Sequence, residues 1–207
     1  MKIIYLIRHS EGLKKKKDIK NSDSLQLINE KNPLSVNGEE RARKLSLIDE
    51  LKKIDVVISS HYVRAMATAK YIANANDLDL NIIDNFGERK FGVNSWNELP
   101  ENFEKKQLFD LDLKLENGES HREVANRMYE GLMNVIDNYY QDRIAIVSHA
   151  TAITFLFMKF CDLKDDNLFF KDKLILDKEF SWNAPEVFKL TFDNKELIDI
   201  THIPLDF

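Results

Sequence analysis

The chain has 207 residues, of which 43% are hydrophobic and 31% charged, and its formal net charge is −5 at pH 7. This length fits one domain over residues 1–207 with a sizeable core, and no stretch approaches the ~18 apolar residues of a membrane span. The acidic balance argues against general nucleic-acid binding, which relies on Lys and Arg to neutralise phosphates. We therefore expect a cytoplasmic protein whose partners include neither nucleic acid nor a membrane.

The single cysteine and one basic run further restrict the kinds of site that the chain can contain. Cys161 alone cannot form an internal disulfide, and it argues against a cysteine-based metal site. Lys14 to Lys17 form the densest basic segment, which we interpret as a solvated loop. The alternative is that this run raises the local concentration of a multiply charged substrate.

Strands and helices are predicted to alternate along the chain. Ser35 can cap a first long helix, in which Ala42, Leu45, Ile48 and Leu51 recur at helical spacing. Ser120 and Glu123 have the spacing of a capping box and introduce a second long helix. In chain order, the predicted elements are a strand at 3–7, helix 35–53, strand 55–58, helix 62–75, strand 81–84, a helical segment around 101–109, helix 120–141, strand 144–147, helix 150–160, and strands 187–192 and 197–203. This order predicts a three-layer α/β/α sandwich with a mainly parallel mixed sheet.

Basic residues follow three of the predicted strands. Arg8 and His9 end the first strand, and Ser148 and His149 follow strand 144–147. Arg64 comes one helical turn after strand 55–58. Because parallel neighbouring strands end at one edge of the sheet, these side chains are expected to converge, and such a cluster favours a bound dianion.

The same residues carry a resemblance to a known family. Its elements are Leu6-Ile7-Arg8-His9, Leu34-Ser35-x2-Gly38, Ser59-Ser60-x3-Arg64-Ala65-x2-Thr68-Ala69, Gly118-Glu119-Ser120 and Val147-Ser148-His149. In this order they resemble the histidine phosphatase superfamily, which includes the cofactor-dependent phosphoglycerate mutases. The resemblance implies a phosphoglycerate mutase-like fold.

The resemblance implies that His9 is a nucleophile that forms a phosphohistidine. An imidazole is largely neutral near pH 7 and can attack phosphorus without a separate base. Arg8, Arg64 and His149 would bind the phosphoryl group and compensate its charge, so we expect neither a metal nor a cofactor.

Glu88 is the expected proton donor and acceptor. It lies in Gly87-Glu88-Arg89-Lys90-Phe91-Gly92, which resembles the acid-bearing segment of the family. A carboxylate near a phosphate dianion should have a raised pKa. The alternative is a surface ion pair of Glu88 with Arg89 or Lys90, and Glu11 is the second candidate acid.

Two residues depart from the family pattern beside the phosphate. Ser10 and Ala150 stand where glycine is usual, and both are assigned to phosphate or substrate binding. Ser10 adds a hydroxyl donor, whereas Ala150 narrows the pocket. Segments 11–33 and 89–117 are expected to be insertions that face the substrate.

Other candidate residues receive structural interpretations. His61 and His121 are expected at the surface. Five phenylalanines are assigned to the core or to a homodimer contact, namely Phe155, Phe157, Phe160, Phe169 and Phe170.

Together these features predict a metal-independent phosphomonoesterase of the histidine acid phosphatase type, acting on a phosphorylated small molecule. One alternative is a phosphoglycerate mutase-type phosphoryl transfer. Mutases that the chain resembles are longer between the acid and the Gly-Glu-Ser element, whereas only residues 89–117 separate them here, so water is harder to exclude. The other alternative is a non-catalytic phosphate-binding module.

Overall fold

The computed structural model describes residues 1–14, 23–179 and 181–207. The α-helices are α1 Leu25–Glu30, α2 Val36–Leu45, α3 Val63–Ala75, α4 Phe103–Phe109, α5 His121–Asn138 and α6 Ala150–Phe157. The strands are β1 Lys2–Arg8, β2 Val56–Ser59, β3 Leu80–Ile82, β4 Arg143–Ser148, β5 Asp162–Lys164, β6 Asn167–Phe170, β7 Lys173–Leu176, β8 Glu186–Asp193 and β9 Glu196–Ile203. Short 3-10 turns lie at Asp49–Leu51, Asp84–Phe86 and Trp96–Glu98.

The central sheet has the strand order β3-β2-β4-β1-β8-β9. The strands β3, β2, β4 and β1 run parallel, while β8 is antiparallel to β1 and β9 is antiparallel to β8. The predicted mainly parallel mixed sheet is therefore confirmed. Both strands of the predicted C-terminal pair are present, joined by a turn in which Asn194 takes a φ of 51°.

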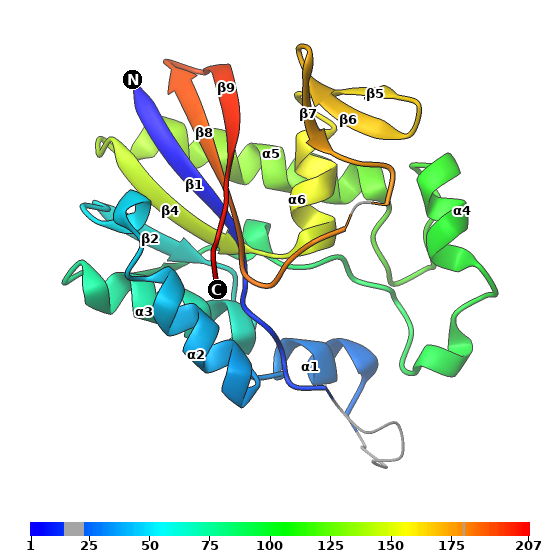
Figure 1. Cartoon of the computed structure of the whole chain (residues 1–207). Coiled ribbons are helices and arrows are strands. Elements are labelled where there is room, and N and C mark those ends of the chain that lie inside the picture. The colour runs from blue at the N-terminus through cyan, green and yellow to red at the C-terminus, as the bar shows by residue number, and fades with distance from the viewer. Residues whose placement is uncertain (15–22, 180) are drawn as a thin grey trace.

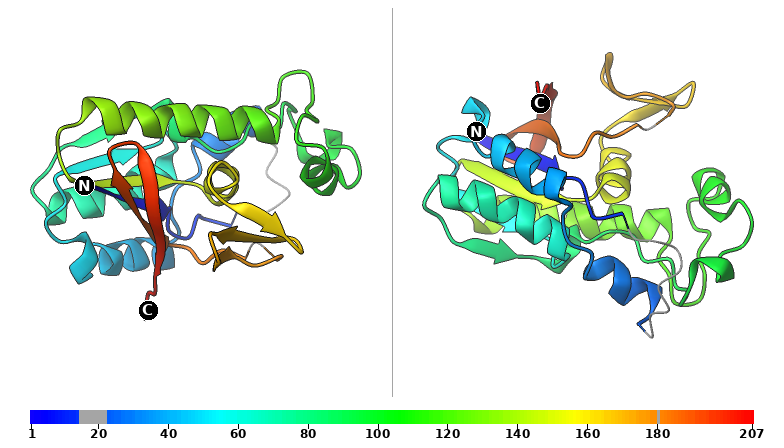
Figure 2. Two further views of the ribbon diagram at one scale, coloured as in Figure 1. Left: turned by 90° about the horizontal axis from the view of Figure 1, so that it is seen from above. Right: turned by 60° about the horizontal axis from the view of Figure 1, so that its bottom comes forward.

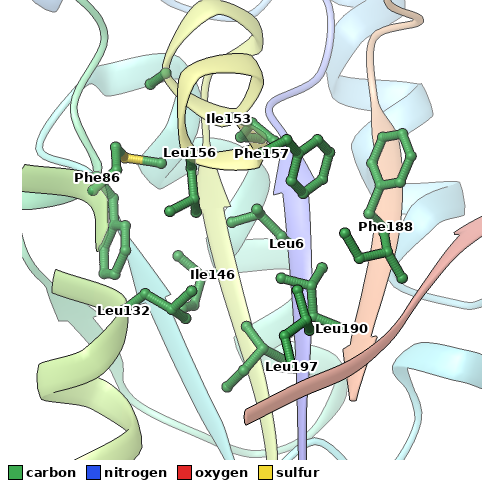
Figure 3. Packing of buried hydrophobic residues seen from close by; sticks show 14 of the residues in the cluster. Leu6, Phe86, Leu132, Ile146, Ile153, Leu156, Phe157, Phe188, Leu190 and Leu197 are labelled. Carbon is green, nitrogen blue, oxygen red and sulfur yellow. The ribbon is translucent and has the colours of Figure 1, made fainter. Parts of the chain in front are cut away.

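Helices cover both faces of this sheet, as Figures 1 and 2 show. On one face, Tyr5, Ile7 and Val57 pack with apolar residues of α2 and α3. On the other face, the alternate side chains Ile4 and Leu6 pack with residues of α5 and α6. Figure 3 shows this second core, where Leu6 and Ile146 from the sheet meet Leu132, Leu156 and Phe157 from the helices. The three predicted layers follow from the period-two alternation of the strands.

A separate three-stranded antiparallel sheet, β5-β6-β7, follows α6. This sheet was not predicted from the sequence. Leu168 and Phe170 of β6 are buried on the main core, whereas the outer strands expose Leu163 and Leu174. Phe155 and Phe157 are buried in the chain's own core, as is Phe170, and Phe160 and Phe169 are partly buried.

The predicted helix over 35–53 was wrong at its C-terminal end. Ser35 caps the helix as expected, since its side chain accepts from the backbone N–H of Gly38. The helix ends at Leu45, because the Ser46 hydroxyl bonds to the Arg43 carbonyl and competes with the helical pattern. A 3-10 turn at Asp49–Leu51 then brings Leu51 into the core.

Other boundaries are shorter than predicted. The helix that begins after Ser120 has both hydrogen bonds of the capping box, but it ends at Asn138 instead of Gln141. The helix after His149 ends at Phe157, and strand 81–84 is replaced by β3 Leu80–Ile82 followed by a 3-10 turn. The helix α1 Leu25–Glu30, capped by the Ser24 side chain, was not predicted. Of the basic run, Lys14 is exposed, whereas Lys15 to Lys17 lie outside the described residues.

Within the described part of the chain, no helix is both long and apolar enough to span a bilayer.

Candidate active site

Three neighbouring parallel strands deliver the predicted basic residues to one edge of the sheet. β1 ends at Arg8, which pairs in register with Ser148 at the end of β4. β2 ends beside β4 and is followed by α3, whose first turn carries Arg64. The expected convergence of the two histidines and Arg64 is therefore present, because parallel strands share one carboxyl edge.

Arg64 joins the two imidazoles. Its Nε donates to Nε2 of His9 at 2.9 Å, and its Nη2 lies 3.2 Å from Nδ1 of His149. The two imidazole rings have their centroids 4.9 Å apart and are steeply inclined to each other. One guanidinium thus holds both rings in a fixed relation.

Each histidine is also fixed through its other nitrogen. Nδ1 of His9 lies 2.6 Å from the carbonyl oxygen of Ser10, so it carries the proton and leaves a lone pair on Nε2. Nε2 of His149 lies 2.8 Å from the Ser60 hydroxyl. Ser60 belongs to the Ser-Ser element of the sequence, but its contact with His149 became visible only in the structure.

Burial keeps both histidines neutral. His9 is 8% exposed and His149 is fully buried. Desolvation lowers the pKa of His9 well below 6.5, and the nearby Arg64 charge adds to this effect. The pKa of His149 is lowered in the same way by burial and by its neighbours His9 and Arg64. A neutral His9 presents the Nε2 lone pair that a nucleophile needs.

Arg8 lies at the same edge of the sheet, but its side chain bonds to the segment that precedes β8 and not to the two histidines. Its Nη1 donates to the carbonyl oxygens of Trp182 at 2.7 Å and Asn183 at 3.0 Å. Burial lowers the pKa of Arg8, and the carboxylates of Glu88 and Glu186 oppose that shift. Two backbone carbonyl groups therefore fix the position of the Arg8 guanidinium.

Glu88 has a carboxylate that is partly buried and held by backbone donors. Its Oε1 accepts from the N–H of Arg89 at 2.9 Å and from the N–H of Ala152, in the first turn of α6, at 3.2 Å. Burial raises the pKa of Glu88, against the opposing effects of the Arg89 N–H and the Arg64 charge. Because α6 begins directly after His149, this contact keeps Glu88 beside the basic cluster.

The alternative interpretation of Glu88 as a surface ion pair does not match its neighbours. The Arg89 side chain is buried and donates to Gln107 at 2.6 Å and to Glu104 at 2.8 Å, both on α4. Lys90 is exposed, and its backbone N–H donates to Glu119.

Arg127 on α5 supports the acid-bearing segment, although no motif in the sequence pointed to this role. It forms a bidentate pair with Glu119, with N–O distances of 2.6 and 3.0 Å. The same guanidinium donates to the carbonyl oxygens of Asn85, Gly87 and Glu88. The Gly-Glu-Ser element therefore supplies the carboxylate that orients Arg127.

The structure corrects the role expected of the Ser10 hydroxyl, whereas the role of Ala150 stays a prediction. The Ser10 hydroxyl donates to the Gly38 carbonyl at 2.7 Å, so it is engaged with α2 and is not a free donor for phosphate. A side chain at Gly38 would place its Cβ 2.0 Å from the Glu11 carbonyl oxygen, which explains why the helix can lie so close. Ala150 is the first residue of α6. Its effect on the pocket remains a prediction.

Glu11 is directed away from the role of an acid. Its carboxylate accepts from the Ser35 hydroxyl at 2.8 Å and from Asn37 at 3.2 Å, and these bonds lower its pKa. A general acid needs the opposite shift.

The prediction that His121 lies at the surface was wrong. Its ring is 2% exposed and stacks on Phe155 with a centroid distance of 3.6 Å. Burial and the Arg89 charge lower its pKa to about 3. The neutral ring avoids the unfavourable helix dipole that a charged one would meet. His61 is half-exposed, 3.0 Å from the Asp84 carboxylate.

The described parts of the two predicted insertions meet each other and the site. The Leu25 N–H donates to the Asn94 carbonyl at 2.9 Å, which joins α1 to segment 89–117. Arg64 also reaches α1, since its Nη1 donates to the Asn29 carbonyl at 2.6 Å. Within the described residues, no group of three or more His, Cys, Asp or Glu side chains is arranged to hold a metal ion.

Comparisons with known proteins agree with this geometry. The chain is 29% identical over 160 residues to a probable phosphoglycerate mutase GpmB of Escherichia fergusonii. The aligned region covers 72% of this chain and 70% of the relative. It is also 29% identical over 121 residues to the uncharacterized phosphatase PhoE of Bacillus subtilis, which covers 58% of this chain and 61% of the relative.

Solved structures show the same fold at low sequence identity. A mycobacterial glucosyl-3-phosphoglycerate phosphatase aligns with a TM-score of 0.70 and 14% identity, covering 97% of this chain and 96% of that one. A phosphoserine phosphatase of Entamoeba histolytica aligns with a TM-score of 0.67 and 19% identity, covering 100% and 98%. A family model described as the histidine phosphatase superfamily (branch 1) matches residues 4–171. This chain therefore belongs to the histidine phosphatase superfamily.

Proposed function

We propose that the chain is a metal-independent phosphomonoester hydrolase that works through a phosphohistidine on His9. The observation that carries the proposal is the state of the His9 ring. Its Nδ1 proton is held by the Ser10 carbonyl, and its Nε2 lone pair faces Arg64 at 2.9 Å. A buried neutral imidazole that points its lone pair at an anion-binding guanidinium is suited to attack phosphorus.

The phosphoryl group would enter between the two imidazoles. Its oxygens would take over the N–H donors of Arg64 that now face His9 and His149, which frees the Nε2 lone pair of His9. Arg8 lies at the same edge, and each charge-assisted hydrogen bond contributes roughly 1.5 to 3 kcal/mol. These fixed cations offset the charge that develops on the phosphoryl oxygens.

Glu88 is proposed to handle the proton in both half-reactions. In the first, a bond forms between Nε2 of His9 and phosphorus while the bond to the alcohol oxygen breaks, and that oxygen takes the Glu88 proton. In the second, Glu88 as a carboxylate accepts a proton from the attacking water, and the nitrogen–phosphorus bond breaks. The raised pKa of Glu88, caused by burial, supports the first role.

Hydrolysis of a chromogenic phosphate ester with chelator present tests the proposal. We expect chelator-resistant hydrolysis by the wild type and its loss in His9→Ala. A Glu88→Gln variant should accumulate acid-labile phosphate on His9. Hydrolysis that depends on an added metal, or that persists in His9→Ala, contradicts the mechanism.

The mutase alternative is supported by the name of one relative, a probable phosphoglycerate mutase. The same protein preparation distinguishes it: phosphoglycerate isomerisation with a bisphosphate primer, without ester hydrolysis, indicates a mutase. The names of the two similar solved structures also suggest esters for a kcat/KM panel, namely glucosyl-3-phosphoglycerate and phosphoserine.

A further inference from the structure

Tyr62 occupies a central place that the roles proposed above do not use. It is the N-cap residue of α3, two positions before Arg64, and it is fully buried. Its side chain contacts the proposed phosphate-binding residues Arg64 and His149, the segment that bears Glu88, and α1. A tyrosine that contacts all three parts can couple the position of one part to the positions of the others.

The ring of Tyr62 contacts both phosphate-binding candidates on its side of the site. It meets the His149 ring edge to face, with centroids 4.5 Å apart and planes inclined by 63°. The Arg64 guanidinium carbon lies 5.0 Å from the centroid of the same ring. Edge-to-face and cation–π contacts depend on orientation, so the Tyr62 ring fixes the planes of both groups.

The hydroxyl of Tyr62 links α1 to the backbone of the proposed acid. It accepts from Nε2 of Gln26 at 2.8 Å and donates to the Glu88 carbonyl at 3.3 Å. The second N–H of Gln26 goes to Glu30 at 2.7 Å, so the amide is oriented by its own helix. Burial raises the pKa of Tyr62, which keeps the hydroxyl protonated and able to donate.

A further bond joins α1 to the site. Arg64 donates from Nη1 to the Asn29 carbonyl at 2.6 Å. α1 therefore reaches the site through Gln26 and Tyr62 on one path and directly through Arg64 on the other. A displacement of α1 would act on Glu88 and on Arg64 together.

We propose that Tyr62 is a positioning residue for phosphoryl transfer: its ring orients His149 and Arg64, and its hydroxyl transmits the placement of α1, through Gln26, to Glu88. This inference rests on the proposed function, because that function assigns phosphate binding to Arg64 and His149 and proton transfer to Glu88. The two parts of the side chain therefore have separable effects. Loss of the hydroxyl should act on turnover, and loss of the ring should also act on phosphate affinity.

The experiment compares Tyr62→Phe, Gln26→Ala, their double variant and Tyr62→Leu in ester hydrolysis and in calorimetric binding of inorganic phosphate. Tyr62→Phe should lower kcat about three- to tenfold, the range of one hydrogen bond, and change the phosphate Kd less than twofold. Gln26→Ala should lower kcat similarly, and the double variant should lose no more than either single one. Tyr62→Leu should weaken phosphate binding about tenfold, because both oriented ring contacts are lost.

Tyr5→Phe is the matched control. Tyr5 is also fully buried, and its hydroxyl donates to Glu50 at 2.8 Å on another part of the molecule. A kcat for Tyr62→Phe equal to that of Tyr5→Phe overturns the proposal, as does an additive double variant. If Tyr62→Leu does not fold, the double-mutant cycle of Gln26→Ala and Tyr62→Phe still tests whether the Tyr62 hydroxyl acts through Gln26.

Failure of the proposed function has a different signature. If the wild type hydrolyses no ester, the phosphoesterase is wrong, and the phosphate Kd then tests the positioning of Arg64 and His149 by itself. An unchanged Kd in folded Tyr62→Leu overturns the inference in that case, and a weakened Kd supports it.

Discussion

Arg64 uses three nitrogens for three different partners. Nε faces His9, Nη2 faces His149, and Nη1 donates to the Asn29 carbonyl. Only a planar fork with fixed donor directions can do this at once. A lysine keeps the positive charge in the buried site, but its single nitrogen cannot occupy the three separate donor positions of the guanidinium.

We therefore expect Arg64→Lys to lower kcat/KM for ester hydrolysis by more than tenfold, the loss of at least one charge-assisted hydrogen bond. Arg43→Lys is the matched control, since Arg43 pairs with Glu40 on the exposed face of α2. Steady-state kinetics of the two variants provide the measurement. Equal activity of Arg64→Lys and the wild type would show that charge alone matters at this position.

Glu88 and His9 together determine the expected pH dependence of turnover. The proposed reaction needs His9 neutral, and burial holds the His9 pKa below 6.5, so kcat/KM should fall only when the pH drops through that lowered value. It also needs Glu88 protonated, and burial raises the Glu88 pKa above 4.5, so activity should fall as the pH rises through that raised value. The profile should be bell-shaped.

Glu88→Gln should lower kcat by about 10²- to 10⁴-fold, the usual contribution of a general acid, and should remove the alkaline limb. The control Glu196→Gln changes an exposed carboxylate at the start of β9 and should keep the full bell. A pH–rate profile of Glu88→Gln that still falls on the alkaline side would assign that limb to another group.

The sequence was most informative where residue type and strand ends coincide. Arg8, His9, Arg64 and His149 could be brought together because parallel strands end at one edge. Ser10, Tyr62 and Arg127 could not be interpreted in the same way, because their roles depend on hydrogen bonds to backbone carbonyls of distant segments. His121 was misjudged because sequence does not show that Phe155 and Arg89 cover it.

The N-terminal ends of the helices were easier to predict than their C-terminal ends. Ser35 and Ser120 cap their helices through side-chain bonds that residue spacing predicts. The helix ends depend on competing local bonds, such as that of Ser46, and on which apolar residue must turn inward. The short helix α1 and the strands β5 to β7 were missed, because short segments carry little periodicity.

Arg127 ties α5 to the segment that bears Glu88. We expect Arg127→Lys to lower kcat about tenfold, because a lysine cannot hold Glu119 in a bidentate pair and also donate to three carbonyl groups. Glu119→Gln should have a similar effect, and the double variant should be less than additive since both act through one contact.

Arg122→Lys is the control for this prediction. Arg122 lies on the same helix but forms a solvent-exposed pair with Asp112, and such pairs contribute little to stability. Kinetics and thermal unfolding of all four variants separate a local effect on Glu88 from a loss of helix stability. If the effects of Arg127→Lys and Glu119→Gln on kcat were fully additive, the two residues would not act through one shared contact.

Three buried histidines form part of the protein interior as neutral groups. Burial lowers the pKa values of His9, His121 and His149, and each is at most 8% exposed. Two of them belong to the proposed reaction, whereas His121 lies under segment 89–117, where Arg89 donates to its ring at 3.2 Å. The fold that favours a neutral nucleophile therefore also becomes sensitive to acid.

The sign of that sensitivity follows from linkage. An unfolded histidine binds its proton near pH 6.5, whereas folded His121 binds it only near pH 3, so the unfolded state holds more protons between these values. The free energy of unfolding should therefore fall as the pH drops below 6.5, by up to about 1.4 kcal/mol per pH unit for each such histidine. Glu88, whose pKa is raised, opposes this trend.

Urea unfolding at several pH values between 7.5 and 5.0 measures the effect before most carboxylates titrate. His121→Gln removes one of the three groups, so the slope of unfolding free energy against pH should decrease by up to about 1.4 kcal/mol per unit. Asn138→Gln, which changes an exposed amide at the end of α5 and no titratable group, should leave the slope unchanged. An unchanged slope in His121→Gln would mean that His121 is protonated in the folded protein, and the Arg89 guanidinium would then face a second positive charge.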